Sequence, residues 1–219
     1  MTDITPTEPT GSPDPADSTD PSAPADLVTG DDGRDRCAWG ARDPLYLTYH
    51  DDEWGRPQRD ERALFELLCL EAFQSGLAWI TILRKRPGFR QAFADFDPEV
   101  VAGYGDADVA RLMADAAIVR NRAKVDAAIA NARAVVGLHE AGTTLVDVVF
   151  GHDPPPSERP SGRRFRSFSE IPSATATSAA LSKDLRSRGF RFVGPVVAYA
   201  LMQAAGVVDD HLDGCWVGV

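Results

Sequence analysis

Cysteine is scarce in this sequence, which has only three cysteines among 219 residues. Three is a small and odd number, which argues against a fold held together by disulfides and leaves metal binding or core packing as roles for these side chains. No apolar run reaches the roughly 18 residues that span a bilayer. The N-terminus also lacks a basic segment followed by an apolar core, the pattern of a secretory signal. We therefore expect a cytoplasmic protein with no membrane partner.

Large apolar residues are almost absent from the first 35 residues, which are rich in Pro, Thr, Ser, Asp and Gly. Such a segment buries too little apolar surface to offset the entropy that is lost on folding. We predict that residues 1–35 form a disordered acidic tail and that residues 36–219 form the folded domain.

Basic residues are outnumbered by acidic ones, 23 Lys and Arg against 33 Asp and Glu, which gives a formal net charge of −10. Nine acidic residues and two arginines precede Cys37, a net of −7, so −3 remains for the rest of the chain. A negative sum argues mildly against a nucleic-acid partner, since phosphate contacts need Lys and Arg. Basic residues are nevertheless clustered within residues 84–90, 120–124, 163–166 and 183–191. Binding depends on where charges lie, so nucleic-acid binding stays open.

Strand signals are weak, and helical spacing dominates from Cys37 onward. Asp60 and Asp106 are suited to be helix N-caps, and Pro98 and Pro195 are suited to a first helical turn. The pattern therefore predicts an all-α fold. The predicted helices cover residues 60–73, 106–116, 121–136, 144–150, 174–188 and 195–205.

Four Cys and His residues lie in two short clusters at opposite ends of the predicted domain: Cys37 with His50, and His211 with Cys215. Thiolate and imidazole are the usual ligands of tetrahedral zinc, and four protein ligands leave no position open for water. Such a zinc site would be structural and would join the two ends. The alternative is ordinary hydrogen-bonded histidines and small buried cysteines, and spacing alone does not decide between them.

A carboxylate occupies the apolar face of the helix that begins near Asp60. Leu64, Leu67 and Leu68 form the apolar stripe, and the next position on it is Glu71. Burying an ionised carboxylate costs several kcal/mol unless the charge is paired. Glu71 therefore either forms a buried ion pair or lines a cavity.

Aromatic residues are dense around this carboxylate in the sequence: Trp39, Tyr46, Tyr49, Trp54 and Trp79. Aromatic walls with one anionic acceptor suit a flat, electron-poor or cationic ligand. The alternative for each ring is core packing, and we prefer that alternative for Trp39 and Trp54.

Residues 182–195 are typical of a helix, a tight connection and a second helix. Gly189 can end the first helix, Gly194 allows a ligand to approach closely, and Pro195 can begin the second helix. The free N–H groups of the second helix would form a phosphate site, with positive charge from Lys183, Arg186, Arg188 and Arg191. A helix-hairpin-helix that grips a DNA backbone fits these features. The alternative is an ordinary turn with a solvated basic face.

Five segments together carry a resemblance to a known family. They are RCAWGARDPLYLTYHDDEWG (36–55), LFELLCLEAFQSGLAWITIL (64–83), IPSATATSAALSK (171–183), RGFRFVG (188–194) and VVDDHLDGC (207–215). In this order they resemble the 3-methyladenine-DNA glycosylase I family of the helix-hairpin-helix superfamily, over nearly all of residues 36–215. The resemblance implies an all-α helix-hairpin-helix glycosylase fold with a zinc site that joins the N- and C-terminal ends of the domain.

The resemblance also implies roles for individual residues. Cys37, His50, His211 and Cys215 match the family's zinc ligands. Glu71 matches the carboxylate that recognises the base and would be the catalytic group. Base-binding aromatic residues are implied at Tyr49 and Trp79, with Tyr46 and Trp54 as further candidates. Contacts to the DNA backbone are implied at Arg188, Gly189, Arg191 and Gly194.

The activity implied is the monofunctional excision of 3-methyladenine from double-stranded DNA that contains alkylated purines. The damaged base is flipped out, and water attacks the sugar C1′. A 3-methylated adenine is already cationic and leaves with little help from protonation, so Glu71 mainly recognises the base and stabilises positive charge. We expect a monomer that works in base-excision repair, in the cytoplasm and on the nucleoid.

The family is described as lacking the catalytic Asp of its superfamily, and we expect Asp210, beside His211, to orient a zinc ligand instead. Two other functions stay open. One is a noncatalytic module that binds DNA through the same hairpin, for which a carboxylate in an aromatic pocket would have no use. The other is a zinc-stabilised helical protein unrelated to DNA, which would have no affinity for polyanions at low salt.

Overall fold

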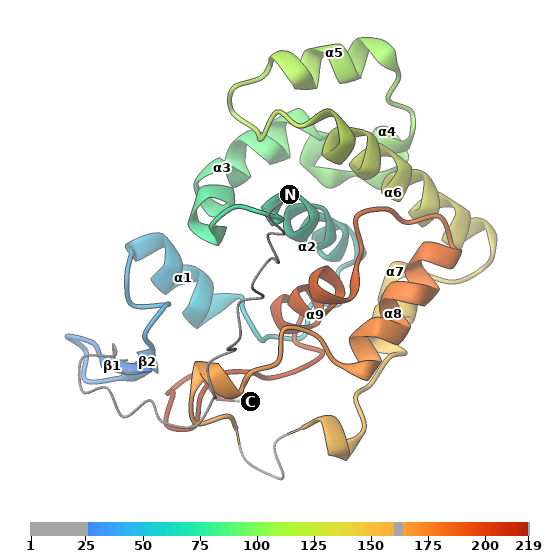
Figure 1. The fold of residues 1–219 in the computed structure, drawn as a ribbon. Coiled ribbons are helices and arrows are strands. Elements are labelled where there is room, and N and C mark those ends of the chain that lie inside the picture. Colours follow the sequence, from blue (N-terminus) through green and yellow to red (C-terminus); the bar gives the residue numbers. More distant parts are fainter. Residues whose placement is uncertain (1–25, 160–163, 219) are drawn as a thin grey trace, which may run out of the picture.

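The computed structural model describes residues 26–159 and 164–218, and within these ranges the chain is mostly helical (Figure 1). Of the disordered tail predicted for residues 1–35, residues 1–25 lie outside the described ranges. The elements are β1 (Leu27–Thr29), β2 (Asp35–Cys37), α1 (Pro44–Asp52), α2 (Glu61–Gln74), α3 (Trp79–Ala92), α4 (Pro98–Ala102), α5 (Asp106–Ala114), α6 (Arg122–Glu140), α7 (Leu145–Phe150), α8 (Ala176–Ser187) and α9 (Pro195–Ala204). Three short 3₁₀ turns add Ala94–Phe96, Pro156–Glu158 and Phe168–Glu170.

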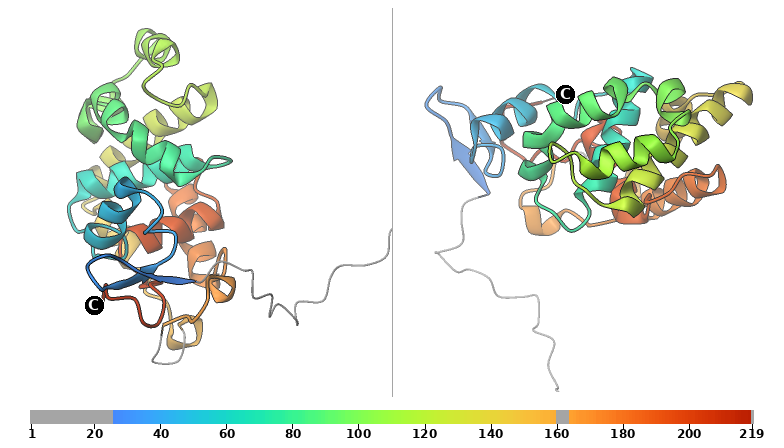
Figure 2. Two further views of the ribbon diagram at one scale, coloured as in Figure 1. Left: turned by 90° about the vertical axis from the view of Figure 1, so that its left-hand side faces the viewer. Right: turned by 90° about the horizontal axis from the view of Figure 1, so that it is seen from above.

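Helices α2 and α9 occupy the centre of the molecule, and the other helices surround them (Figure 1). Helix α2 contacts α9, α3, α6 and α7, while α4 packs on α6 and α8 packs on α9. Further views place α5 and the β1–β2 pair at opposite ends of the fold (Figure 2). In the described part of the chain, no helix has both the length and the apolar character that a membrane crossing requires.

Helix α2 is buried on all sides. Its N-cap is Asp60, whose side chain accepts a hydrogen bond from the N–H of Ala63, as the sequence predicts. Every residue from Leu64 to Phe73 is buried, so the helix cannot keep a polar face in water. This burial takes two carboxylates, Glu66 and Glu71, into the interior.

The predicted helices are confirmed as α2, α5, α6, α7, α8 and α9, with ends that differ by a few residues. The N-cap prediction for Asp106 is wrong by one residue. Gly105 precedes α5, and the N–H of Gly105 donates to the carboxylate of Asp108, so Asp106 is the first helical residue. Pro98 and Pro195 do begin their helices.

Helices α1 and α3 were not predicted, and α4 was predicted only in its first turn, at Pro98. Helix α3 contains Pro87, which breaks the usual pattern of a helix interior, and several basic side chains. Its burial of Ile82, Leu83 and Phe89 against the rest of the core stabilises it nevertheless. Tertiary packing outweighs the local sequence preference here.

The strand pair corrects the boundary that the composition predicts at residue 35. Strands β1 and β2 are antiparallel, with Leu27 opposite Cys37, so the folded part begins before Arg36. Leu27 packs on the small core of Cys37, Leu212, Cys215 and Val217, and Trp216 donates its backbone N–H to the carbonyl of Asp35 (2.8 Å). The contact that orders this segment comes from the other end of the chain, where local composition gives no sign of it.

Candidate active site and metal centre

A cavity of about 440 Å³ opens between α1, α2, α3 and α9. Its aromatic lining includes all five rings that the sequence singled out, and α2 contributes Glu71 and Gln74. The size is typical of a small-molecule site. The full lining is Trp39, Tyr46, Tyr49, Trp54, Glu71, Gln74, Trp79, Phe168, Ile171, Pro172, Ser173, Val196, Tyr199, Ala200 and Gln203.

Glu71 is the acidic group of this cavity. It is 6% exposed, and among the described residues its carboxyl group takes part in no hydrogen bond or ion pair. Burial raises the pKa of Glu71 to about 8, because the charged form has lost its water. Of the two possibilities that the sequence leaves open, the structure therefore selects the cavity and not the ion pair.

Glu66, five residues earlier on α2, is also a buried carboxylate, but its charge is paired. Its buried carboxylate accepts hydrogen bonds from Arg86 (2.8 Å) and from Arg90 (2.8 and 3.0 Å) on α3. Arg86 also pairs with Glu53. The same helix thus holds one carboxylate that is fully paired and one that is not.

Trp79 begins α3 and brings a second unpaired polar atom to the cavity. Its Nε1 is closed off from solvent and has no hydrogen-bond partner among the described residues. The indole ring packs on Tyr49, with centroids 5.4 Å apart. A buried donor without a partner is rare in native proteins and points to a ligand.

Tyr49 and Tyr46 project from α1 toward the same cavity. Burial, followed by the nearby charge of Glu71, raises the pKa of Tyr49 well above its usual value, which keeps the hydroxyl protonated. The hydroxyl of Tyr46 accepts a hydrogen bond from the N–H of Ile80 (3.0 Å) and so fixes the start of α3. The first tyrosine therefore offers a donor, while the second supports the fold of the wall.

The connection between α2, which carries Glu71, and α3, which begins at Trp79, is held in place by Lys124 of α6. The buried Lys124 ammonium donates to the carbonyls of Phe73 (2.8 Å) and Ser75 (2.7 Å) at the end of α2. A cation at this position also complements the helix dipole. Lys124 thus fixes the stretch of backbone between the two cavity residues Glu71 and Trp79, and sequence reasoning missed it.

Other lining residues were also missed, among them Tyr199 and Gln203 on α9. Both donate to the buried carboxylate of Asp210, from the Tyr199 hydroxyl (2.6 Å) and the Gln203 Nε2 (2.7 Å). The expectation that Asp210 orients His211 is therefore wrong. Their spacing of four on one helix places Tyr199 and Gln203 on the same face, a signal that was available in the sequence.

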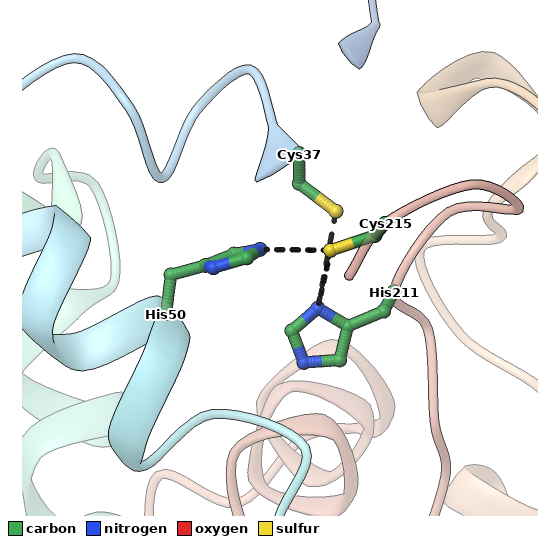
Figure 3. A group of neighbouring side chains, drawn as sticks. All are labelled: Cys37, His50, His211 and Cys215. Carbon is green, nitrogen blue, oxygen red and sulfur yellow. Dashed lines mark hydrogen bonds between the residues drawn. The ribbon is translucent and has the colours of Figure 1, made fainter. Parts of the chain in front are cut away.

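The four Cys and His residues of the two terminal clusters converge in space, as Figure 3 shows. Their ligand atoms lie within 4.8 Å of one another, and all four residues are buried. The Cys215 Sγ is 3.5 Å from the His50 Nε2 and 3.7 Å from the His211 Nδ1, and the Cys37 Sγ is 3.9 Å from the His211 Nδ1. Tetrahedral zinc bonds of about 2.3 Å to sulfur and about 2.0 Å to nitrogen would set N···S separations of about 3.6 Å. The donor set fits such an ion.

The outer nitrogen of each histidine has a partner that fixes the ring. The His50 Nδ1 lies 2.8 Å from the carboxylate of Asp51, and the His211 Nε2 lies 3.1 Å from the backbone carbonyl of Trp54. These acceptors leave the His50 Nε2 and the His211 Nδ1 facing the cluster with free lone pairs. Such support is typical of metal-ligating histidines.

Asp51 collects side chains from both ends of the domain. Arg36, which precedes the ligand Cys37, donates to it at 2.9 to 3.1 Å, and Trp216, which follows the ligand Cys215, donates its Nε1 at 3.3 Å. Asp51 itself follows the ligand His50 and contacts its ring, so this one carboxylate is linked to three of the four candidate ligands or to residues next to them. The cluster is therefore surrounded by its own supporting layer.

The helix, tight connection and second helix predicted for residues 182–195 are confirmed, since α8 ends at Ser187 and α9 begins at Pro195. Gly189 has φ of +96°, which favours glycine, and Gly194 is the N-cap of α9. A side chain at Gly194 would meet nothing within 4 Å, so the backbone there is open to approach. Arg188 pairs with Asp184 (2.8 Å), whereas Arg191 has no ion pair among the described residues.

A second hollow of about 600 Å³ lies between this hairpin, α6 and the start of α5. Arg122, Arg133, Arg188 and Arg191 line it, together with two carboxylates. The hollow is larger than the aromatic cavity, but its lining is mainly ionic, has Tyr104 as its one aromatic ring and holds no buried carboxylate. We therefore place the candidate active site in the aromatic cavity.

Comparison with known proteins agrees with this geometry. A family model described as methyladenine glycosylase matches residues 39–218. The DNA-3-methyladenine glycosylase 1 of Escherichia coli is 47% identical over 181 residues, which are 83% of this chain and 95% of that protein. The DNA-3-methyladenine glycosylase of Haemophilus influenzae is 40% identical over 183 residues, which are 82% of this chain and 96% of that protein.

Solved structures agree as well. A crystal structure of 3-methyladenine DNA glycosylase I superposes with a TM-score of 0.78 at 43% identity, covering 84% of this chain and all of that one. A variant of such an enzyme in complex with 3-methyladenine superposes with a TM-score of 0.75 at 36% identity, covering 83% of this chain and 96% of that one. With sequence, fold and cavity in agreement, this chain belongs to the methyladenine glycosylase family.

Proposed function

We propose that this protein is a DNA glycosylase that excises 3-methyladenine from alkylated DNA. The observation that carries the proposal is the aromatic cavity, in which a buried carboxyl group and a buried indole N–H have no partner. Unpaired groups of opposite hydrogen-bonding character suit a flat heterocycle with donors and acceptors on its edge. The named relatives are DNA-3-methyladenine glycosylases, and one related structure contains 3-methyladenine.

Recognition of the base would combine ring stacking with one charged contact. Trp79 and Tyr49 would contact the faces of the base, and Tyr46 and Trp54 would complete the walls. Because burial raises the pKa of Glu71 to about 8, the empty site favours the neutral acid at pH 7. A cationic 3-methyladenine nucleotide would lower that pKa again and recruit the carboxylate as its partner. Neutral normal bases would lack this gain.

Catalysis would follow from the charge of the substrate. The N-glycosidic bond breaks with its electron pair passing to the base, which leaves as neutral 3-methyladenine. A water oxygen bonds to C1′ and loses its proton to solvent. The Glu71 carboxylate would stabilise the positive charge that develops on the sugar. Among the described residues that line the cavity there is no lysine, which supports a monofunctional enzyme without a covalent intermediate.

Double-stranded DNA would be held by the hairpin. The backbone around Gly189 and Gly194, at the start of α9, would face phosphates, with Arg188 and Arg191 supplying charge. The nucleotide would then be flipped into the cavity. A monomer suffices, since one chain carries both parts. We place the enzyme in base-excision repair in the cytoplasm, on the nucleoid when it is bound to DNA.

Zinc would occupy the cluster of Cys37, His50, His211 and Cys215. Once bound, it would supply a structural cross-link between the two ends of the domain, because four protein ligands leave no open coordination position. The cluster's fit to tetrahedral separations and the oriented histidines support this assignment. No step of the reaction depends on the ion.

The test is the release of free 3-methyladenine from alkylated duplex DNA, followed by chromatography. The wild type should release it, and Glu71→Gln and Tyr49→Ala should reduce the rate by roughly 100-fold or more, with folding unchanged by circular dichroism. The matched control is Glu140→Gln, an exposed carboxylate at the end of α6, which should behave as the wild type. A folded wild type that releases no base would refute the proposal and favour the noncatalytic DNA-binding module.

A further inference from the structure

Phe192, in the α8–α9 hairpin, is both exposed and strained. Its side chain is 42% exposed, and its φ is +55°, in the left-handed region. A bulky side chain rarely adopts this backbone conformation, which glycine would take without cost. Neither burial nor local backbone preference explains a phenylalanine at this position.

Two buried polar side chains hold the hairpin on either side of Phe192. Asn131 of α6 accepts from the N–H of Arg191 (2.7 Å) and donates to its carbonyl (3.2 Å). Ser182 of α8 donates its hydroxyl to the carbonyl of Val193 (2.6 Å). Both clamping side chains are fully buried. The strained conformation is therefore imposed by the surrounding fold, the usual sign of a functional constraint.

Along the chain, Phe192 lies between a residue that lines the second hollow and a residue that lines the aromatic cavity. Arg191, directly before it, lines the basic hollow, and Val196, four residues after it, lines the aromatic cavity and is 59% exposed. The hairpin passes beside α6 at this point (Figure 1). An exposed apolar ring on the segment that joins a positively charged residue to a residue of the base-sized cavity suits a nucleic acid, which presents apolar bases and sugars beside its charged phosphates.

We propose that Phe192 is a DNA-contacting residue that packs against the nucleotide next to the extruded one. The inference rests on the proposed function and adds to it a side-chain contact made by the hairpin, in addition to contacts from its backbone. Aromatic and apolar side chains that fill or flank a disrupted base step favour the distorted duplex. The fold tolerates the strain at Phe192 because the ring is needed on this face.

The experiment compares Phe192→Gly, Phe192→Ala and Phe192→Tyr in two assays. Release of 3-methyladenine from duplex DNA should fall about 10-fold or more in the first two variants and recover in Phe192→Tyr, which keeps the ring. Affinity for free 3-methyladenine should change by less than about twofold, since the base site is left intact. Phe192→Gly should also have a higher midpoint of thermal unfolding than the wild type, because glycine relieves the strain.

Val100→Ala, at an apolar residue on α4 that is 49% exposed, is the control and should match the wild type in both assays. If the wild type releases base and the Gly and Ala variants do so equally well, the role of Phe192 is refuted while the proposed function stands. Equal losses in release and in free-base affinity would also refute it, because they would indicate a collapsed site. If the wild type releases no base, the proposed function fails, and affinity for duplex DNA with an abasic-site analogue decides: a loss of about 10-fold in Phe192→Ala supports the contact, and no loss overturns it.

Discussion

The metal cluster and the aromatic cavity are two buried polar sites built in part from the same stretch of chain, and they differ in how their polar atoms are satisfied. In the cluster, each histidine nitrogen faces a sulfur, a carboxylate or a carbonyl. In the cavity, Glu71 and the Trp79 Nε1 have no partner among the described residues. Satisfied buried networks fix a structure, whereas unpaired groups mark a place that is completed by a ligand.

The two sites also share walls. Trp39 lies with its ring 5.2 Å from that of His50 and 5.6 Å from that of Tyr46, and Trp54 both lines the cavity and accepts from His211. Damage to the cluster should therefore reach the cavity. Damage confined to the cavity should leave the cluster intact, and this asymmetry can be tested.

Loss of one metal ligand should have the largest effect. We expect Cys215→Ala to lose its metal and about 3 kcal/mol or more of unfolding free energy, which lowers the melting temperature by roughly 6–12 °C. Metal analysis and thermal denaturation measure both. Cys69→Ala is the control, because Cys69 is a buried core cysteine outside the cluster. A Cys215→Ala protein that keeps one equivalent of metal and the wild-type melting temperature would show that the cluster is not a metal site.

Glu71→Gln should change stability in the opposite direction. The folded state raises the pKa of Glu71 from 4.5 to about 8, so the native protein binds more protons than the unfolded chain between these values. Wild-type stability should therefore fall as pH rises from 4.5 to 8, and Glu71→Gln should lack this loss. At pH 8.5 we expect the variant to be more stable by about 2 kcal/mol or more, with no gain below pH 4. Denaturant unfolding at several pH values measures the free energy of unfolding of both proteins. If Glu71 were paired instead, the wild type and Glu71→Gln would show the same pH dependence between pH 4.5 and 8.

The layer around the cluster should matter less than the ligands. Asp51→Asn replaces the carboxylate that orients His50 and holds Arg36, and we expect metal affinity to fall about 10- to 100-fold. Competition with a chromophoric chelator measures this affinity. Asp52→Asn, at the exposed neighbouring position, should retain wild-type affinity. If the two variants bind metal equally well, Asp51 does not support the cluster.

Lys124→Met should have the smallest effect, and it should be confined to the cavity. Without the ammonium, the end of α2 loses two hydrogen bonds and the α2–α3 connection loosens, so affinity for free 3-methyladenine should fall about 3- to 10-fold while metal content stays unchanged. Quenching of tryptophan fluorescence measures the affinity. Lys85→Met is the matched control, since its ammonium donates to the carbonyl of Ala116, which does not line the cavity. An effect of equal size in both lysine variants would contradict the positioning role.

Much of the contrast between the metal cluster and the aromatic cavity could be predicted from residue patterns. Helical periodicity placed Glu71 on a buried face, and the residue types of the two terminal clusters suited zinc. Spacing alone could not predict that the two clusters converge, because this depends on contacts between residues more than 150 positions apart, such as Cys37 with His211; only the family resemblance implied it. The β1–β2 pair, ordered by the C-terminal segment, and α3, stabilised by packing despite Pro87, escaped for the same reason. Phe192 escaped because a positive φ at a residue other than glycine leaves no mark in the sequence.

The most direct measurement of the central claim is a calorimetric titration of free 3-methyladenine into the wild type, into Glu71→Gln and into Glu140→Gln. The claim that Glu71 completes its bonding through the base predicts one equivalent bound by the wild type and by Glu140→Gln, and affinity at least about 10-fold weaker in Glu71→Gln. A folded, metal-loaded Glu71→Gln protein that binds the base as tightly as the wild type would contradict it.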